Sequence, residues 1–196
     1  MSEVEDAVSE AIEQGRDSRL NAAVAILVAL TATFMALCNV KDGNVAQAMT
    51  EAQSKSVDTW SYFQAKSTKQ SLAEATVDQL KAILLIAPPE SRPAIEKSIA
   101  DYTSRVKRYE TEKNAIQADA KKYQQTYESL NLHDDQFDMS DAALSVSIAL
   151  FGITALTRKR WLLGVAIVFM LYGVFFGIAG FAGWSIHPDA LMSWLS

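Results

Sequence analysis

The sequence predicts an all-α membrane protein with three transmembrane helices and a long antiparallel coiled-coil hairpin inserted between the first and the second. Two observations lead to this prediction. Apolar blocks lie near both ends of the 196-residue chain, and nearly all of the charge lies outside them. The central stretch repeats its apolar residues in alternating steps of three and four, which is the spacing of a coiled-coil seam.

Three segments are predicted to cross the membrane, at residues 21–40, 137–157 and 161–184. Crossing about 30 Å of hydrocarbon takes about 20 residues of helix. The first and third segments contain no charged residue, whereas the uncharged part of the second begins only at Ala142. The second span therefore borrows residues from the acidic stretch before it or thins the bilayer locally. A cleaved signal peptide is the alternative for the first block, but an acidic rather than a basic segment precedes it.

The basic residues near the span ends predict the orientation. They are Arg16 and Arg19 before the first span, and Arg158, Lys159 and Arg160 between the second and the third. Because positive charge in short loops stays in the cytoplasm, we expect residues 1–20 and the turn 158–160 to be cytoplasmic. The segment 41–136 and the tail 185–196 then lie on the far side of the membrane, which is the periplasm if the source is a Gram-negative bacterium. The inverted topology stays open, because segment 41–136 is longer than the loops to which the rule applies.

The central segment is predicted to form two helices joined by a turn near residues 87–93. Three prolines lie within six residues there, and proline ends a preceding helix. We expect one helix over about 44–86 and a second over about 93–130. Breaks near Gly43 and at residues 131–138 would separate them from the spans.

Each of these two helices has a predicted seam. The seam of the second helix is Ile95, Ile99, Tyr102, Val106, Tyr109, Lys113, Ile116, Ala120, Tyr123, Tyr127 and Leu130. The looser seam of the first is Met49, Ala52, Ser56, Thr59, Phe63, Lys66, Gln70, Ala73, Val77, Leu80 and Leu84. Antiparallel pairing places Leu80 opposite Ile99, and several small residues opposite large ones, as interdigitating cores favour.

Small residues also recur on one face of each span. The faces are Ala22, Ala25, Ala29, Ala32 and Ala36 in the first span, and Ala142, Ser145, Ala149, Gly152 and Ala155 in the second. Small faces let transmembrane helices approach closely, so we expect Ala36 near Ala142 and Ala29 near Ala149. In the third span, Gly173-x-x-x-Gly177 predicts a contact between copies.

The middle of the hairpin contains a predicted polar layer, with Lys66 facing Lys113 and Gln70 facing Tyr109. Two lysines in one layer repel unless an anion or a carboxylate lies between them. Glu74, Glu110 or Glu112 could supply that carboxylate, or the lysines could extend into water. The functional interpretations are a layer that fixes the register and a small anion site.

Three aromatic residues lie within four helical positions: Trp60, Tyr62 and Phe63. Successive residues point about 100° apart, so the three cannot all face the partner helix. We expect part of this surface to contact another copy, because exposed apolar patches mark interfaces. The alternative is a monomer whose aromatics lie against its own tail or the lipid surface.

The sequence gives little reason to expect an enzyme or a cofactor. The two histidines are His133 and His187, and the single cysteine, Cys38, lies inside the first span. His133, Asp134 and Asp138 are weak candidates for divalent metal ligands. A solvated acidic start of the second span is the simpler interpretation. The net charge of −5 and the small number of clustered basic residues argue against a nucleic-acid partner.

The run Trp60-Ser61-Tyr62-Phe63-Gln64-Ala65-Lys66-Ser67 carries a family resemblance. It follows a short acidic segment and one span, and precedes two spans joined by Thr157-Arg158-Lys159-Arg160-Trp161. In this arrangement the chain resembles the bacterial membrane proteins grouped as domain-of-unknown-function family 4337. The resemblance covers nearly the whole chain. It implies a bacterial inner-membrane location and implies no activity.

Two functions remain open at this point. The first is a non-enzymatic inner-membrane protein that self-assembles through its hairpin into a homo-oligomer, as an envelope scaffold or accessory subunit. The second is a channel or transport component with a pore formed between copies. The apolar cores of the spans contain no Asp, Glu, Lys or Arg, which usually mark ion routes, and this favours the first.

Overall fold

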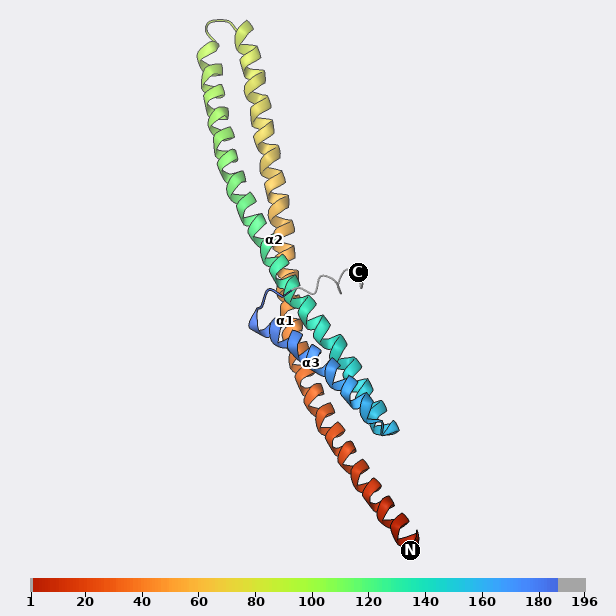
Figure 1. Ribbon diagram of the computed structural model, residues 1–196. Helices are drawn as coiled ribbons and strands as arrows, with labels where there is room; N and C mark the ends of the chain where they lie inside the picture. The colour runs from red at the N-terminus through yellow and green to blue at the C-terminus, as the bar shows by residue number, and fades with distance from the viewer. Residues whose placement is uncertain (1, 187–196) are drawn as a thin grey trace. The chain divides into compact units, whose positions relative to one another are not determined.

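The computed structural model describes residues 2–186, and the side chains from residue 19 onwards. This part of the chain is helical throughout, with no strand (Figure 1). The three helices are α1 (Ser2–Ile86), α2 (Arg92–Thr157) and α3 (Arg160–Ala182). They make two compact units: unit 1 comprises Met1–Ala48 and Ser129–Ser196, and unit 2 comprises Met49–Glu128.

Helices α1 and α2 run without interruption, so the breaks predicted near Gly43 and at residues 131–138 are wrong. A single glycine inside a helix costs only about 1 kcal/mol relative to alanine, which the neighbouring turns readily offset. Residues 131–138 contain neither glycine nor proline, so nothing in that stretch ends a helix. The aspartates there lie inside α2 and do not begin a new helix.

The chain reverses direction at the proline-rich run, between the end of α1 at Ile86 and the start of α2 at Arg92. The Ser91 amide donates to the Pro88 carbonyl at 3.0 Å, and the Arg92 Nε donates to the Ala87 carbonyl at 3.2 Å. Pro93 lies in the first turn of α2, where its missing amide hydrogen leaves no helical bond unmade.

In unit 2, α1 and α2 lie side by side in opposite directions (Figure 1). Every residue of the two predicted seams within this unit is buried or half-buried. The least exposed are Ala52, Ala73, Val77 and Ala120, with 5%, 4%, 8% and 0% of their surface exposed. Three of these four are alanines that the predicted register sets opposite larger residues, which allows the two helices to approach closely.

In unit 1, α3 packs against parts of both α1 and α2 through its glycines. A Cβ added at Gly173 would lie 2.7 Å from Leu144 Cγ, and one added at Gly177 would lie 2.7 Å from Phe34 Cε1. A Cβ at Gly180 would meet the ring of Phe137 at 2.8 Å. The glycines therefore let bulky side chains of α1 and α2 approach the α3 backbone directly.

This packing shows that one prediction was wrong: the small faces of the first two spans do not contact each other. Ala29 and Ala36 of α1 are exposed, as are Ala142 and Ala149 of α2. The opposite faces of α1 and α2 turn inward, because the glycines of α3 provide room for their larger side chains. The buried residues on those faces are Val24, Thr31, Cys38, Phe137, Leu144 and Phe151.

Each of the three helices contains a stretch long and apolar enough to cross a membrane. The α2–α3 turn is short: α2 ends at Thr157, and Arg158 adopts a left-handed backbone conformation with φ 58°. Helix α3 ends at Gly183, where φ is 68°, and the Trp184 amide donates to the Ala179 carbonyl at 3.0 Å. Glycine suits that position because a side chain disfavours positive φ.

Candidate functional site

The predicted polar layer of unit 2 centres on Lys66. Its Nζ lies 2.5 Å from Glu112 Oε2, and 5.4 Å and 5.5 Å from the ring centroids of Tyr62 and Tyr109. The hydrogen bond raises the pKa of Lys66 and lowers the pKa of Glu112. Glu112 is the neighbour of the predicted partner Lys113, and it is one of the carboxylates expected to supply the counter-charge. The charge of Lys66 is thus neutralised within the chain without a bound anion.

The other members of the polar layer, Gln70, Tyr109 and Lys113, do not share one pattern of contacts. The Gln70 amide donates to Glu74 Oε1 at 2.9 Å, along α1, and does not reach Tyr109 in any hydrogen bond between described residues. Its own Oε1 is buried and has no hydrogen-bond partner among the described residues. Lys113 is half-buried. The layer therefore joins the two helices at one point, through Lys66 and Glu112.

The aromatic cluster is divided between the inside and the outside of unit 2. Phe63 lies in the seam and is half-buried, and Trp60 packs edge-on against it with ring centroids 5.4 Å apart. Tyr62 is 52% exposed. Contacts within the chain thus cover part of the Trp60 and Phe63 surface, and Tyr62 is the member most available to another molecule.

The outward side of α1 in unit 2 carries an uncharged stripe. Its members lie between Asp58 and Asp78, two exposed aspartates on the same side, and are Ser61, Gln64, Ala65, Thr68, Ser71, Leu72 and Ala75, all exposed. Helical periodicity places them on the side opposite the seam. Leu72 is 68% exposed. The exposed residues of α2 in the same unit include many charged ones, so the two helices present different surfaces.

Two hydroxyl groups of the uncharged stripe bond to the backbone of α1. Ser61 Oγ donates to the Val57 carbonyl at 2.9 Å, and Thr68 Oγ1 donates to the Gln64 carbonyl at 3.0 Å. These groups therefore present mainly carbon outward. Sequence reasoning followed the inward positions and missed the stripe. The available signal was the absence of Asp, Glu, Lys and Arg from the outward positions between Asp58 and Asp78.

Four aspartates lie close together in unit 1. Burial, followed by the charges of Asp134 and Asp138, raises the pKa of Asp42 to about 6. Burial, followed by the charge of Asp135, raises the pKa of Asp134 as well. The interaction between the side chains of Asp42 and Asp134 raises the pKa of Asp42 further. The fourth member, Asp141, also raises the pKa of Asp42 through its charge.

The weak metal-ligand candidates His133, Asp134 and Asp138 are not brought together as a ligand group in the described part of the chain. Among residues 19–186, no three His, Cys, Asp or Glu side chains are grouped so that they could hold a metal ion. His133 lies about 100° around the helix from Asp134, and its Nδ1 is 3.2 Å from Gln136 Oε1. Asp138 is exposed. The second histidine, His187, lies outside the described residues.

Gln136 is a buried polar residue that the sequence did not single out. It is fully buried, and its Nε2 donates to the Trp184 carbonyl at 2.8 Å and to the Ile186 carbonyl at 2.7 Å. One side chain of α2 thus satisfies two backbone groups that follow α3. A lone glutamine has no periodic pattern, so no sequence signal marked it.

The predicted contact between copies at Gly173 and Gly177 is also corrected. Both glycines are buried inside unit 1, where they face Leu144 and Phe34. They join helices of one chain and are not available to a second copy.

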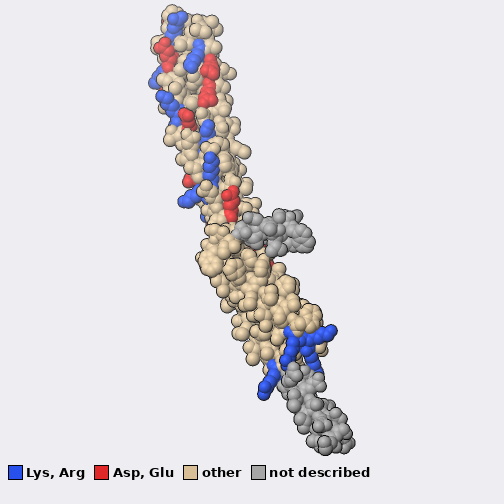
Figure 2. All heavy atoms as spheres, viewed as in Figure 1, with Lys and Arg blue, Asp and Glu red and all other residues tan. Residues whose placement is uncertain are grey.

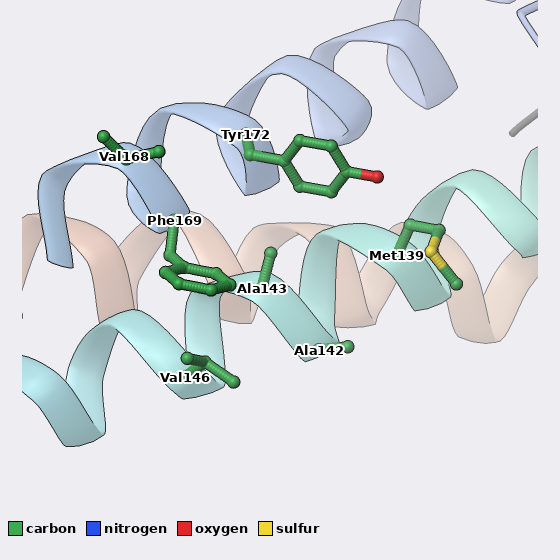
Figure 3. Close-up of a pocket in the computed structure, with 7 residues that line it drawn as sticks. All are labelled: Met139, Ala142, Ala143, Val146, Val168, Phe169 and Tyr172. Carbon is green, nitrogen blue, oxygen red and sulfur yellow. The ribbon is translucent and has the colours of Figure 1, made fainter. Parts of the chain in front are cut away.

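A shallow apolar groove of about 360 Å³ lies between α2 and α3 on the outside of unit 1 (Figure 3). It is lined by Met139, Ala142, Ala143, Val146, Val168, Phe169 and Tyr172. The phenol hydroxyl is the single oxygen among these side chains. The groove is suited to hydrocarbon, because it offers few hydrogen-bonding groups to a polar substrate.

Comparison with known proteins finds a match at the level of the family. No curated protein and no solved structure matches the chain. The family model described as "Domain of unknown function (DUF4337)" matches residues 20–183. This match extends from the last turn before the first apolar stretch to the glycine that ends α3, so the chain belongs to the DUF4337 family.

Proposed function

We propose that the chain is a non-enzymatic integral protein of the bacterial inner membrane that self-assembles through its hairpin and acts as an envelope scaffold or accessory subunit. The single observation that carries this proposal is the uncharged stripe of α1. A solvated helix surface normally bears charge, and a long uncharged face is typical of a contact with another helix.

The exposed surface of unit 1 supports the membrane location. Val168, Leu171 and Phe175 of α3 are 65%, 58% and 46% exposed. These side chains suit a lipid environment, because burying apolar surface away from water contributes about 25 cal/mol per Å². The basic residues at the α2–α3 turn support a cytoplasmic turn. If α2 crosses the membrane, the hairpin is then periplasmic.

The packing of unit 2 supports an antiparallel coiled coil. Its seams repeat every seven residues, and the least exposed seam positions are small residues. Such a pair leaves the outer surface of each helix free for further association. In this proposal the seam between α1 and α2 builds the hairpin, and the uncharged stripe joins one hairpin to the next.

A second copy of the chain is the occupant that fits the uncharged stripe. Copies in one membrane share their orientation, so their stripes run parallel and at the same height, and a cyclic assembly follows. Ser61, Ala65, Thr68 and Ala75 are small, which allows close approach of two helices. Tyr62 and the exposed part of Trp60 flank the stripe.

Disulfide crosslinking tests this arrangement. In a Cys38→Ala background, Leu72→Cys should give crosslinked dimers in membranes under mild oxidation. The matched control is Ser104→Cys, an exposed position on α2 in the same unit, which should remain monomeric. Equal crosslinking at both positions would indicate random collision and contradict the proposal.

A charge placed in the stripe gives an independent measurement. Ala75→Glu buries a carboxylate in the proposed contact and should reduce the mass of the detergent-solubilised assembly to that of a monomer. Ala100→Glu makes the same change on the exposed side of α2 and should leave the mass unchanged. A wild type that is already monomeric, or an Ala75→Glu variant of unchanged mass, would reject the proposed interface.

The alternative, a channel between copies, finds less support in unit 1. Ser147 and Thr154 are fully buried, and their hydroxyls donate to the Ala166 and Leu150 carbonyls at 2.8 Å each. Thr31 is buried as well. Asn21, Thr33, Asn39 and Ser145 are exposed, and these polar residues could line a pore between copies. Conductance of the purified protein in planar bilayers would favour the channel over the scaffold.

A further inference from the structure

A hollow at the end of unit 1 opposite the aspartates combines two arginines with two leucines. It has a volume of about 420 Å³ and is lined by Arg19, Leu20, Arg160 and Leu163. Arg19 comes from α1, and Arg160 is the first residue of α3. Both arginines are exposed. Leu20 is 9% exposed and belongs to a core cluster against which Leu163 packs, so the hollow is cationic and apolar at once.

The two guanidinium groups have no counter-charge among the described side chains. None of the salt bridges between described residues includes Arg19 or Arg160. The described part of unit 1 contains no acidic residue from Arg19 to Lys41 or after Asp141. Figure 2 shows Lys and Arg side chains gathered at this end of the unit. Among the described side chains, the charge around the hollow is therefore positive and attracts an anion.

The start of α3 strengthens this attraction. Lys159 is its N-cap residue, and the side chain makes no capping hydrogen bond. The first turn of a helix carries unsatisfied amide hydrogens and the positive end of the helix dipole. Because α3 has 23 residues, the dipole is fully developed at Arg160.

We propose that this hollow binds one anionic phospholipid, with its phosphate between Arg19 and Arg160 and an acyl chain along Leu20 and Leu163. A guanidinium group presents paired donors that match the oxygens of a phosphate. The apolar half of the lining suits a lipid better than a free phosphate ion, and basic pockets between membrane helices are typical sites for anionic headgroups. The bound lipid links α1 to α3.

This inference depends on the proposed membrane location, but it does not depend on self-assembly, since all four lining residues belong to one chain. The two ideas can therefore fail separately. Lipid bound per protomer reports the hollow, and the mass of the protein assembly reports the uncharged stripe.

Native mass spectrometry of the full chain in mild detergent tests the site, with phosphatidylglycerol and phosphatidylcholine as probes. Wild type should bind the first phosphatidylglycerol at least tenfold more tightly than phosphatidylcholine. The Arg160→Gln variant should lose roughly fivefold in affinity, and the Arg19→Gln, Arg160→Gln double variant should lose the preference. Equal binding of the two lipids by wild type would overturn the proposal.

The matched control is Lys159→Gln, which removes one charge from the same turn but outside the hollow. It should change the affinity for phosphatidylglycerol by less than about twofold, roughly the effect of a more distant charge on a screened surface. If Lys159→Gln weakens binding as much as Arg160→Gln does, diffuse surface charge explains the preference and the site is rejected.

Two further measurements separate a lipid from free phosphate and protect against a misfolded variant. Leu163→Trp should fill the hollow without changing its charge, and should abolish the preference for phosphatidylglycerol while the helical content is retained. Inorganic phosphate in large excess should not displace the lipid from wild type. Displacement by phosphate, or unchanged lipid binding by Leu163→Trp, would show that no acyl chain occupies the hollow.

Discussion

The two units of the molecule solve helix packing in opposite ways. In unit 2, two helices meet through alanines such as Ala73 and Ala120, and one ion pair, Lys66 with Glu112, joins them across the seam. In unit 1, the small residues are glycines of α3, and they receive bulky side chains from both other helices. The difference shows what a third helix does: it decides which faces of the first two become the interior.

Replacing a glycine of α3 that contacts a bulky side chain should disrupt the packing of unit 1 more than any other change considered. Gly177→Val adds a side chain whose Cβ alone would lie 2.7 Å from Phe34 Cε1 and 2.9 Å from Cys38 Sγ. Overpacking of this kind costs about 1–3 kcal/mol, so the melting temperature in detergent should fall by several degrees.

The matched control is Gly164→Val in the same helix, where an added Cβ would have no neighbour within 4 Å. It should unfold close to the wild-type temperature. Equal loss in the two variants would mean that valine is disfavoured in α3 for reasons other than packing, and the glycines would lose their proposed role.

Removing the side chain that holds the end of α3 should have the next largest effect. Gln136→Leu keeps a similar volume but loses the bonds to the Trp184 and Ile186 carbonyls. Each hydrogen bond that is lost contributes about 0.5–1.5 kcal/mol to stability. Hydrogen exchange should then increase at the end of α3 more than in unit 2; a uniform increase across both units would contradict this local role.

Asp42 should make the stability of unit 1 depend on pH. Its pKa is raised from 3.8 to about 6, so the folded state favours the protonated form and loses stability as the pH rises from about 4 to 6. Asp42→Asn should therefore raise the melting temperature at pH 7.5 and change little at pH 4. A variant that stabilises equally at both pH values would show that ionisation of Asp42 is not the cause.

The ion pair of unit 2 should matter least. Lys66→Met retains an apolar stem in the seam, and Glu112 is exposed enough to stay hydrated, with Arg108 3.7 Å away. We expect the melting temperature to change by only about 2 °C, because ion pairs are often replaceable by apolar residues of similar size. A large loss would show that the Lys66–Glu112 bond, and not alanine packing, sets the stability of unit 2.

The sequence predicted the interior of unit 2 well because a helix in a two-helix pair has one partner. Each seam position then has a single possible neighbour, and residues such as Ala73 and Ala120 could be placed by periodicity alone. The same reasoning failed for Ala29 and Ala149. A face of small residues predicts that another helix approaches closely, but it does not identify which helix that is. Gln136 bonds to backbone carbonyls, and the pattern of side chains along a sequence does not predict bonds of that kind.

Gln136 has a consequence for the position of α3 along its own axis. Gly173 and Gly177 are spaced by about one helical turn, so sliding α3 by about 5.4 Å would bring one glycine to the place of the other. Glycine packing alone would discriminate weakly between these two registers. The hydrogen bonds of Gln136 to the Trp184 and Ile186 carbonyls exist in only one of them. The side-chain amide of Gln136 therefore fixes the position of α3 along its own axis, because it favours one of two similar registers.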